Sequence, residues 1–199
     1  MMLLVAVVLG YLFGSFPTGY LIGRSRGVDV RKFGSGGTGG TNVLRTLGKG
    51  AAIMTGVVDI LKGTLAAYVG YRIAGDWGYA LGGVAALVGH SYPVWLGFRG
   101  GKSVATGAGA LALFYWPAFL VGLAVGIPTI ALTRWVSLGS LLGGLAYTAA
   151  AAIYAKHPSH IVLMAFAYGV VVVRHWSNIK RILNGTENRI GEKAKEIKP

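Results

Sequence analysis

Residues 104–132, VATGAGALALFYWPAFLVGLAVGIPTIAL, decide how this chain folds. The stretch is uncharged, and its 29 residues are too many for one helix across a bilayer, which needs about 20, and too few for two full crossings. Pro117 and Pro128 lie inside it, and a proline breaks or kinks a helix. Whether this stretch crosses once or bends back therefore sets the path of everything that follows it.

The composition around this stretch is that of an integral membrane protein. The 199 residues are 54% hydrophobic and only 13% charged, whereas a soluble domain carries about 25% charged residues. The 33 glycines fit helices that pack closely in lipid. We expect one all-α membrane domain over residues 1–199. The other apolar segments are 2–22, which lacks the positive leader of a signal peptide, and 51–73, 77–97, 137–155 and 159–173.

The positive charges indicate which way the chain runs. Sixteen of the 19 lysines and arginines fall in four stretches, namely 24–49, 99–102, the lone Arg134 and 174–198. The positive-inside rule places all four in the cytoplasm, which requires 104–132 to leave and return with a bend near Tyr115–Pro117. The sequence thus predicts seven transmembrane helices, two of them short around Pro117, with the N-terminus outside and the C-terminus cytoplasmic. A shallow re-entrant hairpin with five full crossings would give the same sidedness.

The formal net charge of +13 points to anionic partners. A nucleic-acid partner is not expected, because no soluble domain carries a basic stripe to receive it. Cytoplasmic loops lying against anionic lipid, and anionic substrates, fit the charge better. The absence of cysteine excludes disulfides, thiolate catalysis and thiolate metal sites. The few carboxylates are scattered and no metal-binding spacing occurs, so we expect neither metal nor cofactor.

A glycine-rich loop, GSGGTGGTN at 34–42, is followed by Arg45. It matches G-x-G-x-x-G, but a membrane helix precedes it instead of a strand, so a dinucleotide fold is rejected. Glycines can turn several backbone N–H groups toward one phosphate, Thr41 and Asn42 could cap the next helix, and Arg45 could clamp the phosphate. The alternative is a flexible interhelical loop that binds no phosphate. The expected phosphate ligands are Gly36, Gly37, Thr41 and Asn42.

A second glycine turn, GFRGGKS, occupies residues 97–103. It is not a Walker A loop, because Leu96 stands where the first glycine would be needed. It still opens an apolar helix, and helix N-termini hold anions. An ordinary positive turn is the alternative reading. The expected ligands are Gly100, Gly101, Lys102 and Ser103.

Other polar residues occur at membrane depth and in the tail. Asp59 and Lys62 share a helix face and should form an ion pair. His90 is more readily explained as structural than as catalytic. We expect all three to lie behind the residues that contact substrate and to position them. His175 and Asn178 would share a face and could position a hydroxyl nucleophile, although a basic segment on lipid headgroups is the alternative. Further predictions are that Glu187 orients His175 or ties down a basic residue, and that His157 and His160 are solvated in an outer loop.

Four stretches together, 14–20, 29–48, 89–106 and 174–187, resemble the bacterial acyl-phosphate:glycerol-3-phosphate acyltransferase family, PlsY, over the whole chain. The resemblance implies transfer of a fatty acyl group from acyl-phosphate to the 1-hydroxyl of glycerol 3-phosphate. The products would be lysophosphatidic acid and inorganic phosphate, in the first acylation of phospholipid synthesis. It implies a multi-pass protein of the bacterial cytoplasmic membrane with its site facing the cytoplasm; a monomer is compatible with the sequence, which leaves the oligomeric state open.

The same resemblance assigns roles to residues. It associates Gly100, Gly101 and Lys102 with glycerol 3-phosphate and marks Ser35 and Arg45 as essential. The proton acceptor stays open between His175 and the phosphate of the substrate. The chain departs from the family pattern, which has Asn, Ala, Gly and Lys where this sequence has Gly37, Gly40, Ser103 and Arg189.

Two other functional classes remain open at this stage. A small transporter of phosphorylated solutes would suit the intramembrane charges, but the sequence shows no internal repeat. A non-catalytic scaffold would bind anionic lipid through the basic tail.

Overall fold

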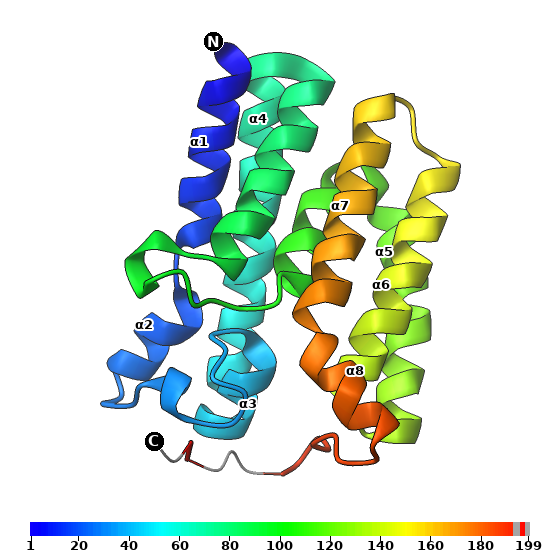
Figure 1. Cartoon of the computed structure of the whole chain (residues 1–199). Helices are drawn as coiled ribbons and strands as arrows, with labels where there is room; N and C mark the ends of the chain where they lie inside the picture. The colour runs from blue at the N-terminus through cyan, green and yellow to red at the C-terminus, as the bar shows by residue number, and fades with distance from the viewer. Residues whose placement is uncertain (193–195, 198–199) are drawn as a thin grey trace.

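The computed structural model describes residues 1–192, 196 and 197, so Lys193, Lys195 and Lys198 of the predicted basic tail lie outside the described residues. The described part is built from helices and turns (Figure 1). Its elements are α1 Met2–Ser15, α2 Thr18–Arg24, η1 Val30–Lys32, α3 Gly40–Leu47, α4 Lys49–Ser91, η2 Val94–Leu96, α5 Val104–Thr133, α6 Val136–Ile153, α7 Pro158–Arg174 and α8 Trp176–Leu183.

The long helices confirm an all-α membrane bundle. Four segments are long and apolar enough to cross a membrane, namely Met2–Arg24, Lys49–Leu96, Val104–Thr133 and Val136–Ile153, and α7 with α8, bent by 55°, adds a fifth. α4 doubles back at Ala74 and Gly75, where Gly75 has φ 60°. α1 with α2, the two limbs of α4, the two limbs of α5, α6, and α7 with α8 together make the expected seven helices in the described residues.

The bend in residues 104–132 is confirmed at Tyr115, whose φ of −128° and ψ of 35° interrupt the helix. The two limbs of α5 then run side by side, since the Tyr147 hydroxyl donates to the Ala108 carbonyl of the first limb (3.2 Å) while the Tyr147 ring lies edge-on to Phe119 of the second (5.6 Å). The first limb is short because Val104 begins partway up the bundle, next to the turn that follows η2 (Figure 1).

Glycines allow the helices to touch at the backbone. A Cβ on Gly63 would lie 2.0 Å from the Thr106 carbonyl oxygen, and one on Gly109 would lie 2.0 Å from the Ile60 carbonyl oxygen. α4 and the first limb of α5 therefore meet closer than any side chain permits. This contact fixes the height of the turn that precedes α5.

Two predicted segments differ from the observed helices. Segment 2–22 is not one helix, because the chain is extended at Phe16 and non-helical at Pro17 before α2 starts at Thr18. Proline has no N–H to continue the ladder, and uniform hydropathy concealed this break. Segment 77–97 ends as an α-helix at Ser91, followed by the short η2.

Candidate active site

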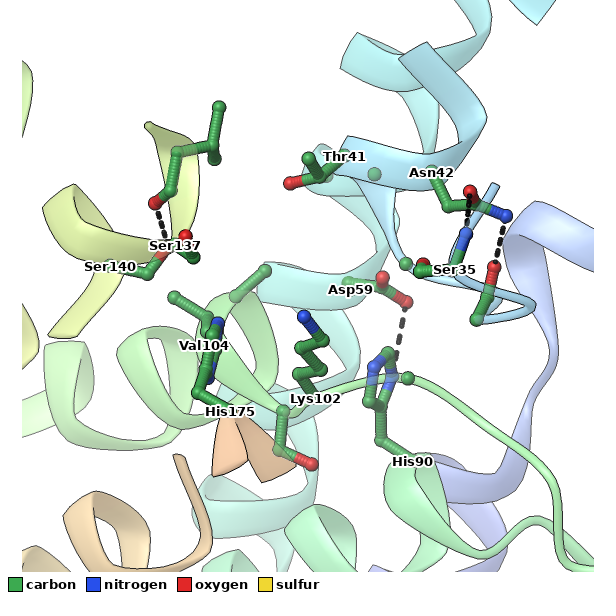
Figure 2. Close-up of a pocket in the computed structure, with 18 of the residues that line it drawn as sticks. Ser35, Thr41, Asn42, Asp59, His90, Lys102, Val104, Ser137, Ser140 and His175 are labelled. Carbon is green, nitrogen blue, oxygen red and sulfur yellow. Dashed lines mark hydrogen bonds and ion pairs between the residues drawn. The ribbon is translucent and has the colours of Figure 1, made fainter. Parts of the chain in front are cut away.

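One cavity of about 280 Å³ is lined by residues from the glycine loop at 34–42, the glycine turn at 97–103 and the segment with His175 and Asn178. Figure 2 shows Lys102 reaching up between His175 on one side and the Asp59–His90 pair on the other. The polar and glycine residues lining the cavity are Ser35, Gly37, Gly39, Gly40, Thr41, Asn42, Arg45, Gly56, Asp59, His90, Gly101, Lys102, Ser103, Ser137, Ser140, His175, Asn178 and Glu187.

Asn42 organises the glycine loop from inside α3. Its amide oxygen accepts the Ser35 N–H (3.0 Å), and its amide nitrogen donates to the carbonyls of Val30 and Gly37 (both 2.9 Å) and of Phe33 (3.1 Å). The prediction that Asn42 or Thr41 caps a helix is wrong, because the helix starts earlier and Gly39 is its N-cap residue. Asn42 instead holds the loop in one shape.

The backbone N–H groups of the glycine loop at 34–42, which were predicted to point toward one phosphate, are only partly open to the cavity. Gly36 has φ 69°, donates its N–H to the Phe33 carbonyl (3.0 Å) and is not among the lining residues. Gly39, Gly40 and Thr41 do line the cavity at the N-terminus of α3. First-turn N–H groups lack an intrahelical acceptor, so this helix end offers donors to an anion.

Two cations face the same space. Arg45, on α3, donates from Nη2 to the Asn188 carbonyl (3.2 Å), and burial lowers the pKa of its guanidinium. Lys102 donates from Nζ to the Asn178 amide oxygen, and burial lowers the pKa of its ammonium to about 8. A desolvated cation gains most from an arriving anion, so both are suited to phosphate.

The turn before α5 is held by backbone contacts. The N–H groups of Gly100 and Gly101 donate to the carbonyls of Ser91 (3.1 Å) and His90 (3.0 Å). Arg174 donates from Nε to the Gly101 carbonyl (3.0 Å). A Cβ on either glycine would overlap His90, so neither position has room for a side chain. Of the two glycines, only Gly101 lines the cavity.

Asp59 and Lys62 form the predicted ion pair, with Oδ1 and Nζ 2.8 Å apart. The same carboxylate oxygen lies 3.6 Å from Nδ1 of His90, and Lys62 also donates to the Phe16 carbonyl (3.0 Å). All three side chains are buried. Asp59 and His90 line the cavity, while Lys62 lies behind them.

His175 and Asn178 lie at the junction of α7 and α8 and both reach the cavity. His175 Nδ1 lies 2.7 Å from the Val171 carbonyl oxygen, which can only accept, so Nδ1 carries a proton. In the neutral ring Nε2 is then an acceptor. The Asn178 amide nitrogen donates to Glu187 Oε1 (2.6 Å), which turns its amide oxygen toward Lys102.

Glu187 is a buried carboxylate that anchors this corner. Besides Asn178 it accepts from Ser137 Oγ (2.8 Å) and Arg181 Nε (2.7 Å), so it ties down a basic residue, one of the two predicted roles. Burial alone would raise the pKa of the Glu187 carboxyl, but these three hydrogen bonds and the charge of Arg181 outweigh it and lower the pKa. Glu187 is therefore ionised at neutral pH.

Comparison with known proteins decides the family. A sequence profile described as Glycerol-3-phosphate acyltransferase matches residues 4–185. This chain belongs to the glycerol-3-phosphate acyltransferase family. It is 55% identical to the glycerol-3-phosphate acyltransferase of Symbiobacterium thermophilum, covering 97% of each chain. It is 44% identical to that of Synechococcus sp. strain CC9902, covering 96% of this chain and 97% of the relative.

Solved structures agree. A crystal structure of PlsY (YgiH), an integral membrane glycerol 3-phosphate acyltransferase in its glycerol 3-phosphate form, has a TM-score of 0.90 at 33% identity, covering 95% of this chain and 96% of that one. The lysophosphatidic acid form of PlsY scores 0.87 at 32% identity, covering 95% of each chain. The chain is thus an integral membrane acyltransferase, and the transporter and scaffold interpretations are set aside.

Sequence reasoning missed two serines that line this cavity, Ser137 and Ser140, at the start of α6. The available signal was their spacing of three residues directly after Arg134, in a segment predicted to begin at the cytoplasmic side. Ser137 binds Glu187, and the Ser140 hydroxyl donates to the Val136 carbonyl (2.9 Å).

The acyltransferase also has an apolar groove of about 200 Å³ between α5, α6 and α7. Four residues line both this groove and the polar cavity, and they are Val104, Ala108, Phe119 and Ser140. The two spaces are therefore adjacent, and the residues between them come from both limbs of α5 and from α6.

At the opposite end of the bundle, the prediction that His160 is solvated is wrong. His160 is buried, with Nε2 2.8 Å from Asp76 Oδ1 and Nδ1 bonded to the Tyr115 hydroxyl. The bends of α4 and α5 bring Asp76 and Tyr115 to it, which no local pattern reveals. His157 is partly exposed, and its Nδ1 accepts the Ser159 N–H (3.2 Å).

Proposed function

We propose that this acyltransferase moves a fatty acyl group from an acyl-phosphate to the 1-hydroxyl of glycerol 3-phosphate, releasing lysophosphatidic acid and inorganic phosphate. The observation that supports this most strongly is the meeting of a cationic cavity and an apolar groove at shared residues. An acyl-phosphate has the matching shape, with a doubly charged head and a long apolar chain joined at the reacting carbonyl.

The residues fit the electrostatic demands of the reaction. The hydroxyl oxygen bonds to the acyl carbon, and the bond from that carbon to the phosphate oxygen breaks, so negative charge passes to the leaving phosphate. Lys102, Arg45 and the N-terminus of α3 face the space where two phosphates would lie. Because an acyl-phosphate is already activated, positioning and charge neutralisation are the main needs, and the proposal requires no metal or cofactor.

The proton of the attacking hydroxyl needs an acceptor, and two groups could supply it. One is Nε2 of His175, which has a free lone pair in the neutral ring because the ring proton lies on Nδ1, hydrogen-bonded to the Val171 carbonyl. The other is the phosphate of the substrate, whose second pKa of ~6 suits it to accept a proton at neutral pH. If H175Q keeps most of the parent kcat with unchanged KM values, the phosphate is the acceptor.

The chain would work in the bacterial inner membrane with the cavity facing the cytoplasm. The clustering of positive residues on one side supports this sidedness. A soluble phosphorylated glycerol would then enter from the cytoplasm, while the acyl chain would lie in the groove at the level of the lipid tails.

The test is a transfer assay on the purified protein in nanodiscs. With acyl-phosphate and glycerol 3-phosphate we expect lysophosphatidic acid and inorganic phosphate in equal amounts. Acyl-coenzyme A should fail as donor, and both R45A and K102A should lose most of the activity. Equal use of acyl-coenzyme A, or phosphate release that does not depend on glycerol 3-phosphate, would contradict the proposal.

A further inference from the structure

A strap formed by residues 184–192 leaves α8 and runs along the lower end of the bundle (Figure 1), and its residue Glu187 lines the cavity. It contacts elements that are distant in sequence, since Glu187 binds Ser137 of α6 and the Asn188 carbonyl accepts from Arg45 of α3. The strap thus contacts Ser137 and Arg45, two residues of the cavity lining that come from α6 and α3.

Arg134, in the turn between α5 and α6, clamps this strap. Its Nη2 donates to the Ile190 carbonyl (3.0 Å), and the Ile190 N–H donates to the Arg134 carbonyl (2.7 Å). Arg134 has φ 62°, in the left-handed region, and this conformation ends α5 where the strap passes. The reciprocal pair fixes one residue of the strap against a turn of the bundle.

The clamp lies close in sequence to the strap residues that hold the site. Ile190 is two residues from Asn188, whose carbonyl holds the Arg45 guanidinium, and three from Glu187, whose carboxylate orients Asn178. Arg134 itself is exposed and is not among the residues that line the cavity. Its influence on the site would therefore pass through the strap.

We propose that Arg134 is a positioning residue for acyl transfer, which clamps the strap so that Asn188 and Glu187 hold Arg45 and Asn178 in their working orientations. The inference rests on the proposed function for its kinetic readout. It assigns to a residue outside the cavity the task of keeping a phosphate-facing guanidinium in place.

Kinetics separate positioning from a general loss of fold. In R134A we expect KM for at least one phosphorylated substrate to rise about fivefold, the effect of losing one ordinary hydrogen bond, with kcat within about twofold of the parent. R134K, which keeps a donor for the Ile190 carbonyl, should recover part of this. The matched control is R24A, which removes an exposed arginine at the end of α2. KM values in R134A equal to those of R24A would overturn the proposal.

A covalent cross-link tests whether Arg134 acts by holding the strap or through its charge. The chain has no cysteine, so R134C/I190C offers two unique thiols for a short bis-maleimide. We expect a raised KM before cross-linking and a KM near the parent value afterwards. A cross-linked protein that keeps the raised KM would show that the guanidinium acts other than through the strap.

A labelling measurement tests the clamp without relying on catalysis, so its result stands even if the proposed function is wrong. The rate at which I190C reacts with a monofunctional maleimide should rise several-fold when R134A is added, because the strap is released. An unchanged labelling rate would refute the clamp even if the parent protein transferred no acyl group. A faster rate in a protein inactive toward acyl-phosphate would support the clamp and reject the substrate.

Discussion

At the scale of single residues, the cavity holds two partly desolvated cations, Arg45 and Lys102. Lys102 follows two glycines that fit only as glycines, and it ends against Asn178 in the cavity. Burial disfavours its charged form, which lowers the pKa to about 8. An anionic substrate restores the balance, so binding and charge are linked at this residue.

This linkage predicts a pH dependence. Below pH 8 Lys102 is charged, and at pH 9 only about a tenth of it is, so kcat/KM should fall as the pH rises through 8. The substrate phosphates are already dianions in this range and contribute little to the change. The measurement is kcat/KM from pH 6.5 to 9.5 in the parent and in K102R.

The arginine variant is the control, because its guanidinium keeps its charge throughout this range. Whatever its absolute activity, its profile should lack the fall near pH 8. An identical fall in both proteins would assign the titration to another group.

Residue types were easier to predict than their partners. The glycines, Arg45, Lys102, His175 and Asn178 stood out because polar residues in an apolar chain require a reason. The partners of Asn42 and His160 could not be predicted, since each depends on a bend or a helix start several residues away. Gly36 and Gly100 do not line the cavity, and their N–H groups are used in the turns themselves.

At the scale of elements, backbone contact between helices fixes the site. Gly63 of α4 and Gly109 of α5 let the two helices touch, and this contact sets the height at which Lys102 enters the cavity. We expect G63A to lower the free energy of unfolding by about 1–3 kcal/mol, because its Cβ would overlap the Thr106 carbonyl.

The matched control is G169A, on an exposed face of α7 where a Cβ would meet nothing within 4 Å. Alanine favours a helix over glycine by ~1 kcal/mol, so G169A should unfold no earlier than the parent. Thermal unfolding in one detergent compares the three proteins. Equal midpoints for G63A and G169A would contradict the packing argument.

Helix boundaries show where sequence reasoning stops. The bend at Tyr115 was predictable because charge on both flanks required a return. The break at Phe16–Pro17 was not, since both sides are apolar and Pro17 could equally have been tolerated near a helix start. The pairing of Lys62 with the Phe16 carbonyl explains how the structure tolerates that break.

At the scale of the whole molecule, the proposed cytoplasmic placement of the site predicts sided labelling. Single cysteines replacing Lys32, Arg134 or Lys180 should react with a membrane-impermeant maleimide only when the cytoplasmic face is open. A cysteine replacing Lys156, between α6 and α7, should react from the other face. Labelling of Lys32 and Lys180 positions from opposite faces would reject the topology.

The central claim is that the cationic cavity and the apolar groove form one site for one elongated, phosphorylated lipid. Alkyl phosphonates of increasing chain length test it directly as competitive inhibitors of the parent, K102A and G144L. Gly144 lines the groove away from the cavity, and a leucine there would fill it.

The parent should bind longer phosphonates progressively more tightly, as each buried methylene adds up to ~0.8 kcal/mol. K102A should weaken every length alike, and G144L should spare short chains while abolishing the gain from long ones. Affinity in the parent that does not depend on chain length, or loss of short-chain binding in G144L equal to that of long chains, would contradict the claim.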